Sequence, residues 1–125
     1  MFKQLGGPLV SSTGAVMPLS SAVEVNGILY LSGALPLVAG KLAGDDIETQ
    51  TKAVFDNIEA LLAKEGLTLG HVFKITTWLT RKEDFAGYNG VYADRLRDPF
   101  PARSTVICDL AMPGALIEVE ATAAR

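Results

Sequence analysis

The chain has 125 residues and a mass of 13.2 kDa, the length of one ordinary domain. With 11 Lys and Arg against 14 Asp and Glu, its net charge is −3, which argues against a protein that binds nucleic acid or another polyphosphate. One Cys and one His exclude an internal disulfide and a structural zinc site. Residues 1–125 are therefore predicted to form a single domain without a metal, and no motif indicates a cofactor.

The chain is apolar for its size, because 49% of its residues are hydrophobic and only 20% are charged, against about 25% charged in an average soluble domain. This excess predicts that some apolar surface is buried against another subunit. No apolar run approaches the ~18 residues that span a bilayer, and the first residues lack a signal-peptide pattern. We expect a protein of the cytoplasm that does not enter membranes.

The first part of the chain indicates strands. Residues 1–20, rich in Gly, Ser and Pro, predict short edge strands and loops. Two β-rich runs within residues 22–33 flank Asn26-Gly27, the favoured two-residue hairpin turn, because both central positions of that turn need a positive φ. A hairpin is therefore expected here.

The rest of the chain alternates helices and strands. Apolar residues at helical spacing predict a helix over residues 45–65, with Asp45 and Glu48 as a capping box and Gly66 just past its end. Residues 71–80 form a strand that is apolar on both faces, which indicates burial on both sides. A second helix is predicted over residues 83–96. Two final strands follow, at residues 103–108 and 116–121, with Pro113-Gly114 as the turn between them.

This order predicts an α+β domain, a mixed sheet with two helices on one face. The other face of the sheet has no helix to cover it. In a chain this apolar, we expect that face to meet a symmetry-related subunit.

Arg103 is the first candidate functional residue. It opens a strand just after Pro101, and a guanidinium held there can grip a carboxylate through two hydrogen bonds. Arg103, Thr105 and Ile107 share one face of the strand. Taken alone, Arg103 is more readily explained by an ion pair with a Glu on the neighbouring strand.

Glu118 and Glu120 are the second candidates, since they share the face of the last strand opposite Ile117 and Val119. Paired acids can activate water or move a proton, although the pattern alone favours a solvated outer face. If the last two strands pair through the Pro113-Gly114 turn, Arg103 and an acid come close across the ladder. By themselves, Asn89 and the Ser32-Gly33 pair indicate only a half-exposed helix position and a turn.

Together these residues resemble the Rid family of reactive intermediate deaminases, also known as the YjgF/UK114 or L-PSP family. Four blocks agree with the family in order and approximate spacing, from about residue 22 to the C-terminus. They are Leu31-Ser32-Gly33, Asp84-Phe85-Ala86 with Asn89 and Val91-Tyr92-Ala93, Pro101 to Thr105, and Ile117 to Ala121.

The resemblance implies a chorismate-mutase-like fold and a homotrimer, with the three sheets forming an inner barrel and pockets between subunits. It also implies hydrolysis of reactive imines and enamines to a 2-keto acid and ammonia. By position, Arg103 would hold the substrate carboxylate and Glu118 would handle the water and the proton. The pocket wall would comprise Ser32, Gly33, Asn89 and Thr105.

Two positions depart from the family pattern. Leu19 stands in place of the pocket Tyr, and Ala34 stands where Gln often follows Ser-Gly. These changes make the pocket more apolar and leave the substrate open. Besides a deaminase, a non-enzymatic binder of small carboxylates or keto acids fits the residues, whereas a ribonuclease or translation inhibitor fits the acidic balance poorly.

Overall fold

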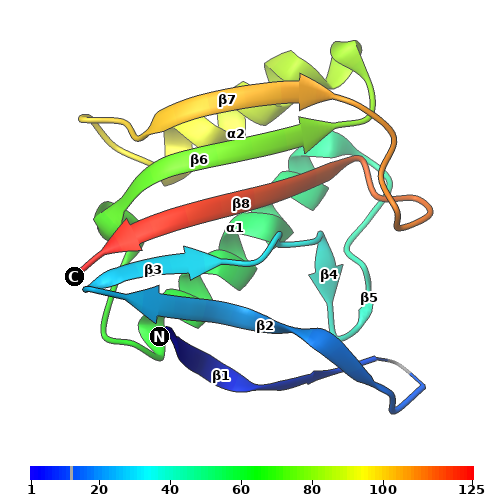
Figure 1. Cartoon of the computed structure of the whole chain (residues 1–125). Helices are drawn as coiled ribbons and strands as arrows, with labels where there is room; N and C mark the ends of the chain where they lie inside the picture. The colour runs from blue at the N-terminus through cyan, green and yellow to red at the C-terminus, as the bar shows by residue number, and fades with distance from the viewer. Residues whose placement is uncertain (12) are drawn as a thin grey trace.

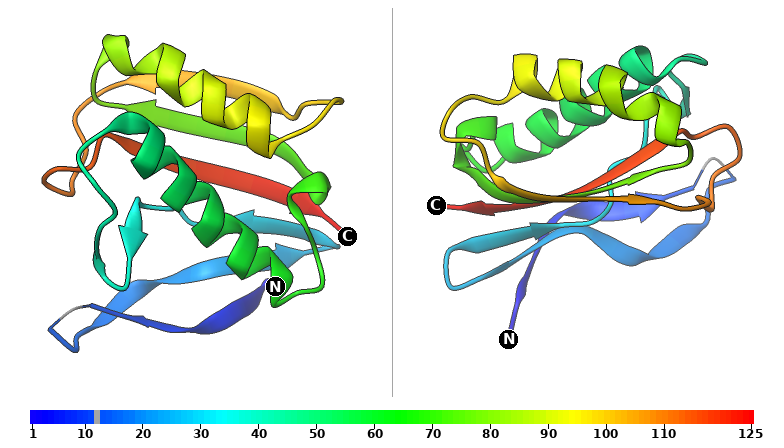
Figure 2. Two further views of the ribbon diagram at one scale, coloured as in Figure 1. Left: turned by 180° about the vertical axis from the view of Figure 1, so that it is seen from behind. Right: turned by 90° about the horizontal axis from the view of Figure 1, so that it is seen from above.

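The protein is described by a computed structural model that places residues 1–11 and 13–125. Its main feature is a six-stranded sheet with two helices packed on one face (Figures 1 and 2), so the predicted α+β class with a mixed sheet is confirmed. The elements are β1 (Lys3–Val10), β2 (Val16–Val25), β3 (Ile28–Leu31), β4 (Leu37–Val38), β5 (Lys41–Leu42), α1 (Ile47–Ala63), η1 (Leu69–His71), β6 (Val72–Leu79), η2 (Lys82–Asp84), α2 (Phe85–Arg95), β7 (Ala102–Ile107) and β8 (Ile117–Ala124). None of the helices described is both long enough and apolar enough to cross a membrane.

The predicted hairpin is β2–β3. Asn26 and Gly27 have φ values of 51° and 80°, and Val25 pairs with Ile28 across the turn, as the two-residue turn requires. The prediction of edge strands before it is confirmed by β1, but the expected short strands and loops are wrong, because β1 and the first half of β2 pair into a long antiparallel ribbon. Its register is irregular around Pro8, which is tolerated because β1 is an edge strand.

Helix α1 is two residues shorter at each end than the predicted range 45–65. Its N-cap is Asp46, not Asp45, and the Asp46 carboxylate accepts a hydrogen bond of 2.8 Å from the backbone N–H of Thr49. After the helix ends, Gly66 adopts a φ of 73°, so the predicted stop is confirmed.

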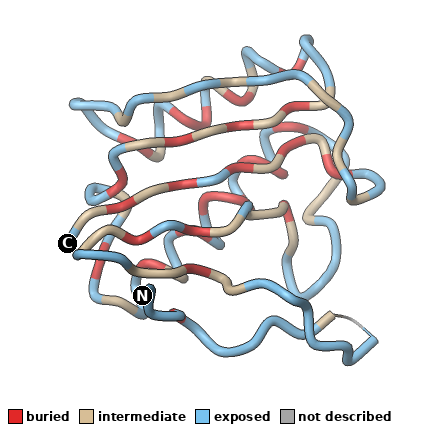
Figure 3. The backbone as a smooth tube through the Cα atoms, in the orientation of Figure 1, coloured by how far each residue is buried: buried red, intermediate tan, exposed pale blue. Residues whose placement is uncertain are grey.

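The core lies between the helices and the sheet, and buried residues alternate with more exposed ones along the central strands (Figure 3). The largest fully buried side chains include Phe55 and Leu62 of α1, Tyr88 of α2 and Ile117 of β8. Because successive side chains on a strand point to opposite faces, this burial fixes which residues face the helices.

The order of the last strands corrects the sequence prediction. The strands run β1-β2-β3-β8-β6-β7, so β6 lies between β7 and β8, and those two do not pair through the Pro113-Gly114 turn. β6, α2 and β7 form a parallel crossover, which places β7 on one side of β6; β8 then pairs antiparallel on the other side. Any contact between Arg103 and Glu118 across a shared ladder is thereby excluded.

Strand β6 is fully buried on one face only. Ile75, Thr77 and Leu79 lie under the helices, whereas Trp78 is half-buried on the open face. The prediction that β6 is buried on both faces is therefore confirmed for the face under the helices. Burial of the open face by another subunit stays a prediction.

Candidate functional site

Arg103 lies at the start of β7, on the face that carries α2. It pairs in register with the buried Ile75, so its side chain points toward the helix. The guanidinium carbon stands 5.6, 5.3 and 4.7 Å from the ring centres of Phe85, Tyr88 and Tyr92. Such cation–π contacts stabilise a charge and restrict its position.

Asn89 completes this arrangement. Its side-chain oxygen accepts a hydrogen bond of 2.7 Å from Nη1 of Arg103. Within the described residues no carboxylate lies within 4.0 Å of the guanidinium, and its strand neighbour is the apolar Ile75. The simpler interpretation, an arginine neutralised by a Glu on the neighbouring strand, is therefore wrong. Among the described residues, Arg103 thus has a hydrogen-bond partner in Asn89 but no anionic partner.

Thr105 follows Arg103 on the same face and pairs with Thr77. The hydroxyl of Thr77 hydrogen-bonds to the Tyr88 hydroxyl at 2.5 Å. Burial raises the pKa of Tyr88, against the opposing effects of this hydrogen bond and of the Arg103 charge. The hydroxyls of Thr105 and Tyr92 are buried without a hydrogen-bond partner among the described residues, so polar groups remain available close to Arg103.

Glu118 lies on the opposite, open face of the sheet. Its neighbours Ile117 and Val119 are fully buried under the helices, and Glu118 pairs in register with Trp78 on the open side. Desolvation raises the pKa of the Glu118 carboxyl, and the negative charge of Glu120 raises it further. The more exposed member of the acidic pair is Glu120.

Gly33 lies directly against Glu118. A Cβ atom at position 33 would stand 2.9 Å from the Glu118 carboxyl carbon, so the glycine makes room for the carboxylate. The next residue, Ala34, forms an isolated bridge with Val119 of β8. This bridge holds the segment after β3 beside β8. The two predicted site residues Gly33 and Glu118 are therefore close neighbours.

Leu19 and Ser32 lie near Gly33 but face a different space. Together with Gly33 they line a hollow of about 270 Å³ whose far wall is α1. The Ser32 hydroxyl donates a hydrogen bond of 2.6 Å to the Ser20 carbonyl, which ties β2 to the end of β3. The Leu19 side chain is 42% exposed, so it is accessible at this surface.

The predicted site residues therefore form two separate groups within the protomer. Arg103, Asn89 and Thr105 lie at the β7 edge beneath α2, and Leu19, Ser32, Gly33 and Glu118 lie around β2, β3 and β8. The sequence interpretation gave no role at Arg103 to the aromatic rings that surround it. Their spacing of three and four residues was the available signal, because it places them on one face of α2.

The fold recurs in solved structures. A mixed sheet covered by two helices is the architecture of YyfA, a Rid-family protein of unknown function from Yersinia pestis, with a TM-score of 0.89, 37% identity and full coverage of both chains. RidA from an Antarctic Psychrobacter gives a TM-score of 0.86 at 30% identity, covering 98% of this chain and 99% of that one.

Sequence comparison agrees. The model of the endoribonuclease L-PSP family matches residues 10–125, so the chain belongs to this family, the family of the Rid and YjgF proteins. Among its relatives is the chloroplastic Reactive Intermediate Deaminase A of Arabidopsis thaliana, 35% identical over 111 residues, which cover 87% of this chain and 59% of the relative.

Proposed function

We propose that the protein hydrolyses 2-imino acids and their enamine tautomers to 2-keto acids and ammonia, at a pocket between subunits. The observation that carries this proposal is Arg103, a guanidinium fixed by Asn89 and three aromatic rings yet without a carboxylate partner among the described residues. Such a group is preorganised for the carboxylate of a small substrate, and two family members bear names of the RidA deaminase type.

The chemistry needs only orientation and one proton carrier. A water oxygen bonds to the imine carbon while its proton passes to the imine nitrogen, which yields a tetrahedral carbinolamine. The hydroxyl proton of the carbinolamine then passes to its nitrogen as the C–N bond breaks, which releases ammonia and the 2-keto acid. Glu118, with its raised pKa, would take the proton from water and return it to nitrogen, because a carboxyl tuned toward neutral pH serves both steps.

A second subunit would bring the two groups of residues together. Arg103 and Glu118 belong to different faces of one sheet, so neither can complete the other's site within one protomer. The open face of the sheet carries half-buried Trp78 and Glu118 and exposed Val106, a surface suited to burial against another copy. A homotrimer with Arg103 of one subunit opposite Glu118 of the next accounts for both observations.

The substrate would be more apolar than the smallest imino acids. Leu19 provides an aliphatic side chain and no hydroxyl at the hollow beside Ser32 and Gly33. Leu19 in place of the family's pocket Tyr removes a hydroxyl group that could act in catalysis but leaves Arg103 unchanged. A protein that binds keto acids without converting them is therefore the second candidate. Ribonuclease action, which the family's description mentions, has weaker support because the net charge is −3. The cytoplasm stays the expected location.

The test is imine hydrolysis by the purified protein. An amino-acid oxidase generates 2-iminopropanoate or a longer imino acid in place, and keto-acid formation is compared with the rate without added protein. The proposal expects acceleration that grows with side-chain length and is lost in Arg103→Ala. No acceleration for any imino acid, with calorimetric binding of keto acids retained, would replace it with the binding function.

A further inference from the structure

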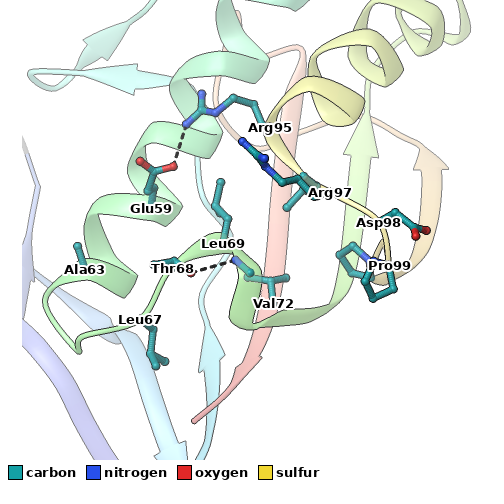
Figure 4. Close-up of a pocket in the computed structure, with 13 residues that line it drawn as sticks. Glu59, Ala63, Leu67, Thr68, Leu69, Val72, Arg95, Arg97, Asp98 and Pro99 are labelled. Atoms are coloured by element: carbon teal, nitrogen blue, oxygen red, sulfur yellow. Dashed lines mark hydrogen bonds and ion pairs between the residues drawn. The ribbon is translucent and has the colours of Figure 1, made fainter.

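A second hollow lies away from Arg103, between the C-terminal half of α1, η1 and the segment that joins α2 to β7 (Figure 4). Its volume is about 590 Å³, within the usual ~300–1,000 Å³ of small-molecule sites. Apolar residues form one part of the lining, namely Leu67, Leu69, Val72, Leu96, Pro99 and Pro101, and the polar part consists of Glu59, Thr68, Arg95, Arg97 and Asp98. An apolar ligand body would displace water from these walls.

Two arginines lie at one end of this hollow. Arg95 is compensated within the protein, because it forms ion pairs with Asp56 at 2.9 Å and Glu59 at 3.4 Å. Arg97 is exposed and takes part in no ion pair among the described residues. Figure 4 shows its guanidinium extending toward Arg95 and Leu69, whereas the Asp98 carboxylate points away. The hollow therefore has an apolar wall, formed by its leucines, valine and prolines, and next to it the guanidinium of Arg97, which has no ion-pair partner among the described residues.

We propose that this hollow binds a medium-chain aliphatic carboxylate. The carboxylate would pair with the Arg97 guanidinium, whose fork matches the two carboxylate oxygens, and the chain would lie over the leucines. One free guanidinium beside the Glu59 carboxylate suits a singly charged anion better than a doubly charged phosphate. The apolar wall in turn requires a ligand with an apolar body.

This site is separate from the proposed deaminase site. The hollow beside Arg103 is lined by Asn89, Tyr92, Ala93, Phe100, Pro101 and Arg103. Pro101 alone borders both hollows. Loss of the Arg103 side chain should therefore leave carboxylate binding near Arg97 unchanged, and failure of either proposal leaves the other standing.

The test is binding of octanoate to the full chain, measured by calorimetry and by amide chemical shifts. Octanoate is expected to shift the amides of residues 67–72 and 95–101. Octanol has the alkyl chain of octanoate but no charge, and acetate has the charge but no long alkyl chain. Each should therefore bind at least about tenfold more weakly than octanoate. Inorganic phosphate should not compete.

Two variants and two controls locate the binding. Arg97→Ala should weaken octanoate about tenfold or more, because it removes a charge-assisted pair. Ala63→Trp, at an exposed position in the wall, should fill the hollow and abolish binding. Lys41→Ala removes one exposed cation in β5 and should bind octanoate normally, and Arg103→Ala should leave the octanoate-induced shifts of residues 95–101 unchanged.

Four results would overturn the proposal. These are no octanoate binding to the wild-type chain, equal binding by Arg97→Ala, octanol binding as tight as octanoate, and chemical shifts centred on residues 89–92 and 103 instead of the Arg97 wall. Arg97→Ala alters only an exposed side chain and is expected to fold. It therefore still tests the proposal if Ala63→Trp fails to fold.

Discussion

Arg103 and Glu118 project from opposite faces of the same sheet, with strand β6 between the strands that carry them. Arg103 lies against the aromatic face of α2, and Glu118 lies against Gly33 on the uncovered side. A reaction that uses both side chains therefore requires a second copy of the chain. This relationship is the basis of the proposed intersubunit site and of the predictions that follow.

The hydrogen bond from Arg103 to Asn89 should set the affinity for a substrate carboxylate. We expect Asn89→Ala to raise KM about tenfold, because a hydrogen bond to a charged group is lost and the guanidinium gains freedom. The effect on kcat should be smaller. Steady-state kinetics measures this split.

Gln50 provides a control for that variant. Its side chain donates to the carbonyls of Gly44 and Gly114, away from Arg103 and from the proposed pocket, so Gln50→Ala should lower the melting temperature and leave KM unchanged. An equal rise in KM in both variants would show that Asn89 acts only through overall stability.

The acid limb of the pH profile should belong to Glu118. The carboxylate form takes the proton from water, so kcat/KM should fall as pH falls through a pKa above the ordinary 4.5, since burial and Glu120 raise it. Glu118→Gln should lower kcat/KM at every pH and remove this limb. Glu120→Gln removes the neighbouring charge and should move the limb to lower pH; an unchanged limb in both variants would contradict the assignment.

The same pKa shift has a consequence for stability. A carboxyl whose folded pKa is raised contributes stability below its unfolded pKa, and that contribution is lost as pH rises through the folded pKa. Glu118→Gln should therefore gain stability relative to wild type between acidic and neutral pH.

Gly33 should be required for activity more than for folding. In Gly33→Ala the new methyl group would press on the Glu118 carboxyl, 2.9 Å away, and displace it. A carboxylate moved by about 1 Å can lose on the order of a hundredfold in rate. Gly7→Ala, in β1 with nothing within 4 Å, is the control; matching activity in the two variants would show that the carboxylate position is unimportant.

Local chemistry made much of the fold predictable. The Asn26-Gly27 turn and the apolar stripe of α1 follow from neighbouring residues, and both were correctly inferred. The pairing of β7 was not, because the Pro113-Gly114 turn reports only a change of direction and says nothing of the strand that pairs next. The α2 crossover decides that pairing through contacts distant in sequence.

The candidate functional site, like the fold, could be predicted in part from the sequence. Residue types and spacing singled out Arg103 and the pair of Glu118 and Glu120, and the family resemblance selected Glu118 from that pair. The strand faces of these residues follow from alternation. Two things could not be predicted from one sequence: that Arg103 has no acidic neighbour among the described residues, and that Tyr88 and Tyr92 surround it. Both depend on which element packs against β7.

Complementation between two inactive variants tests the shared site most directly. Arg103→Ala and Glu118→Ala proteins are dissociated, mixed in equal amounts and reassembled, and imine hydrolysis is measured against each variant reassembled alone. If Arg103 of one subunit works with Glu118 of another, random assembly restores about a quarter of the wild-type activity. Activity no higher than that of either parent, with mixed oligomers demonstrated by mass spectrometry, would contradict the intersubunit site.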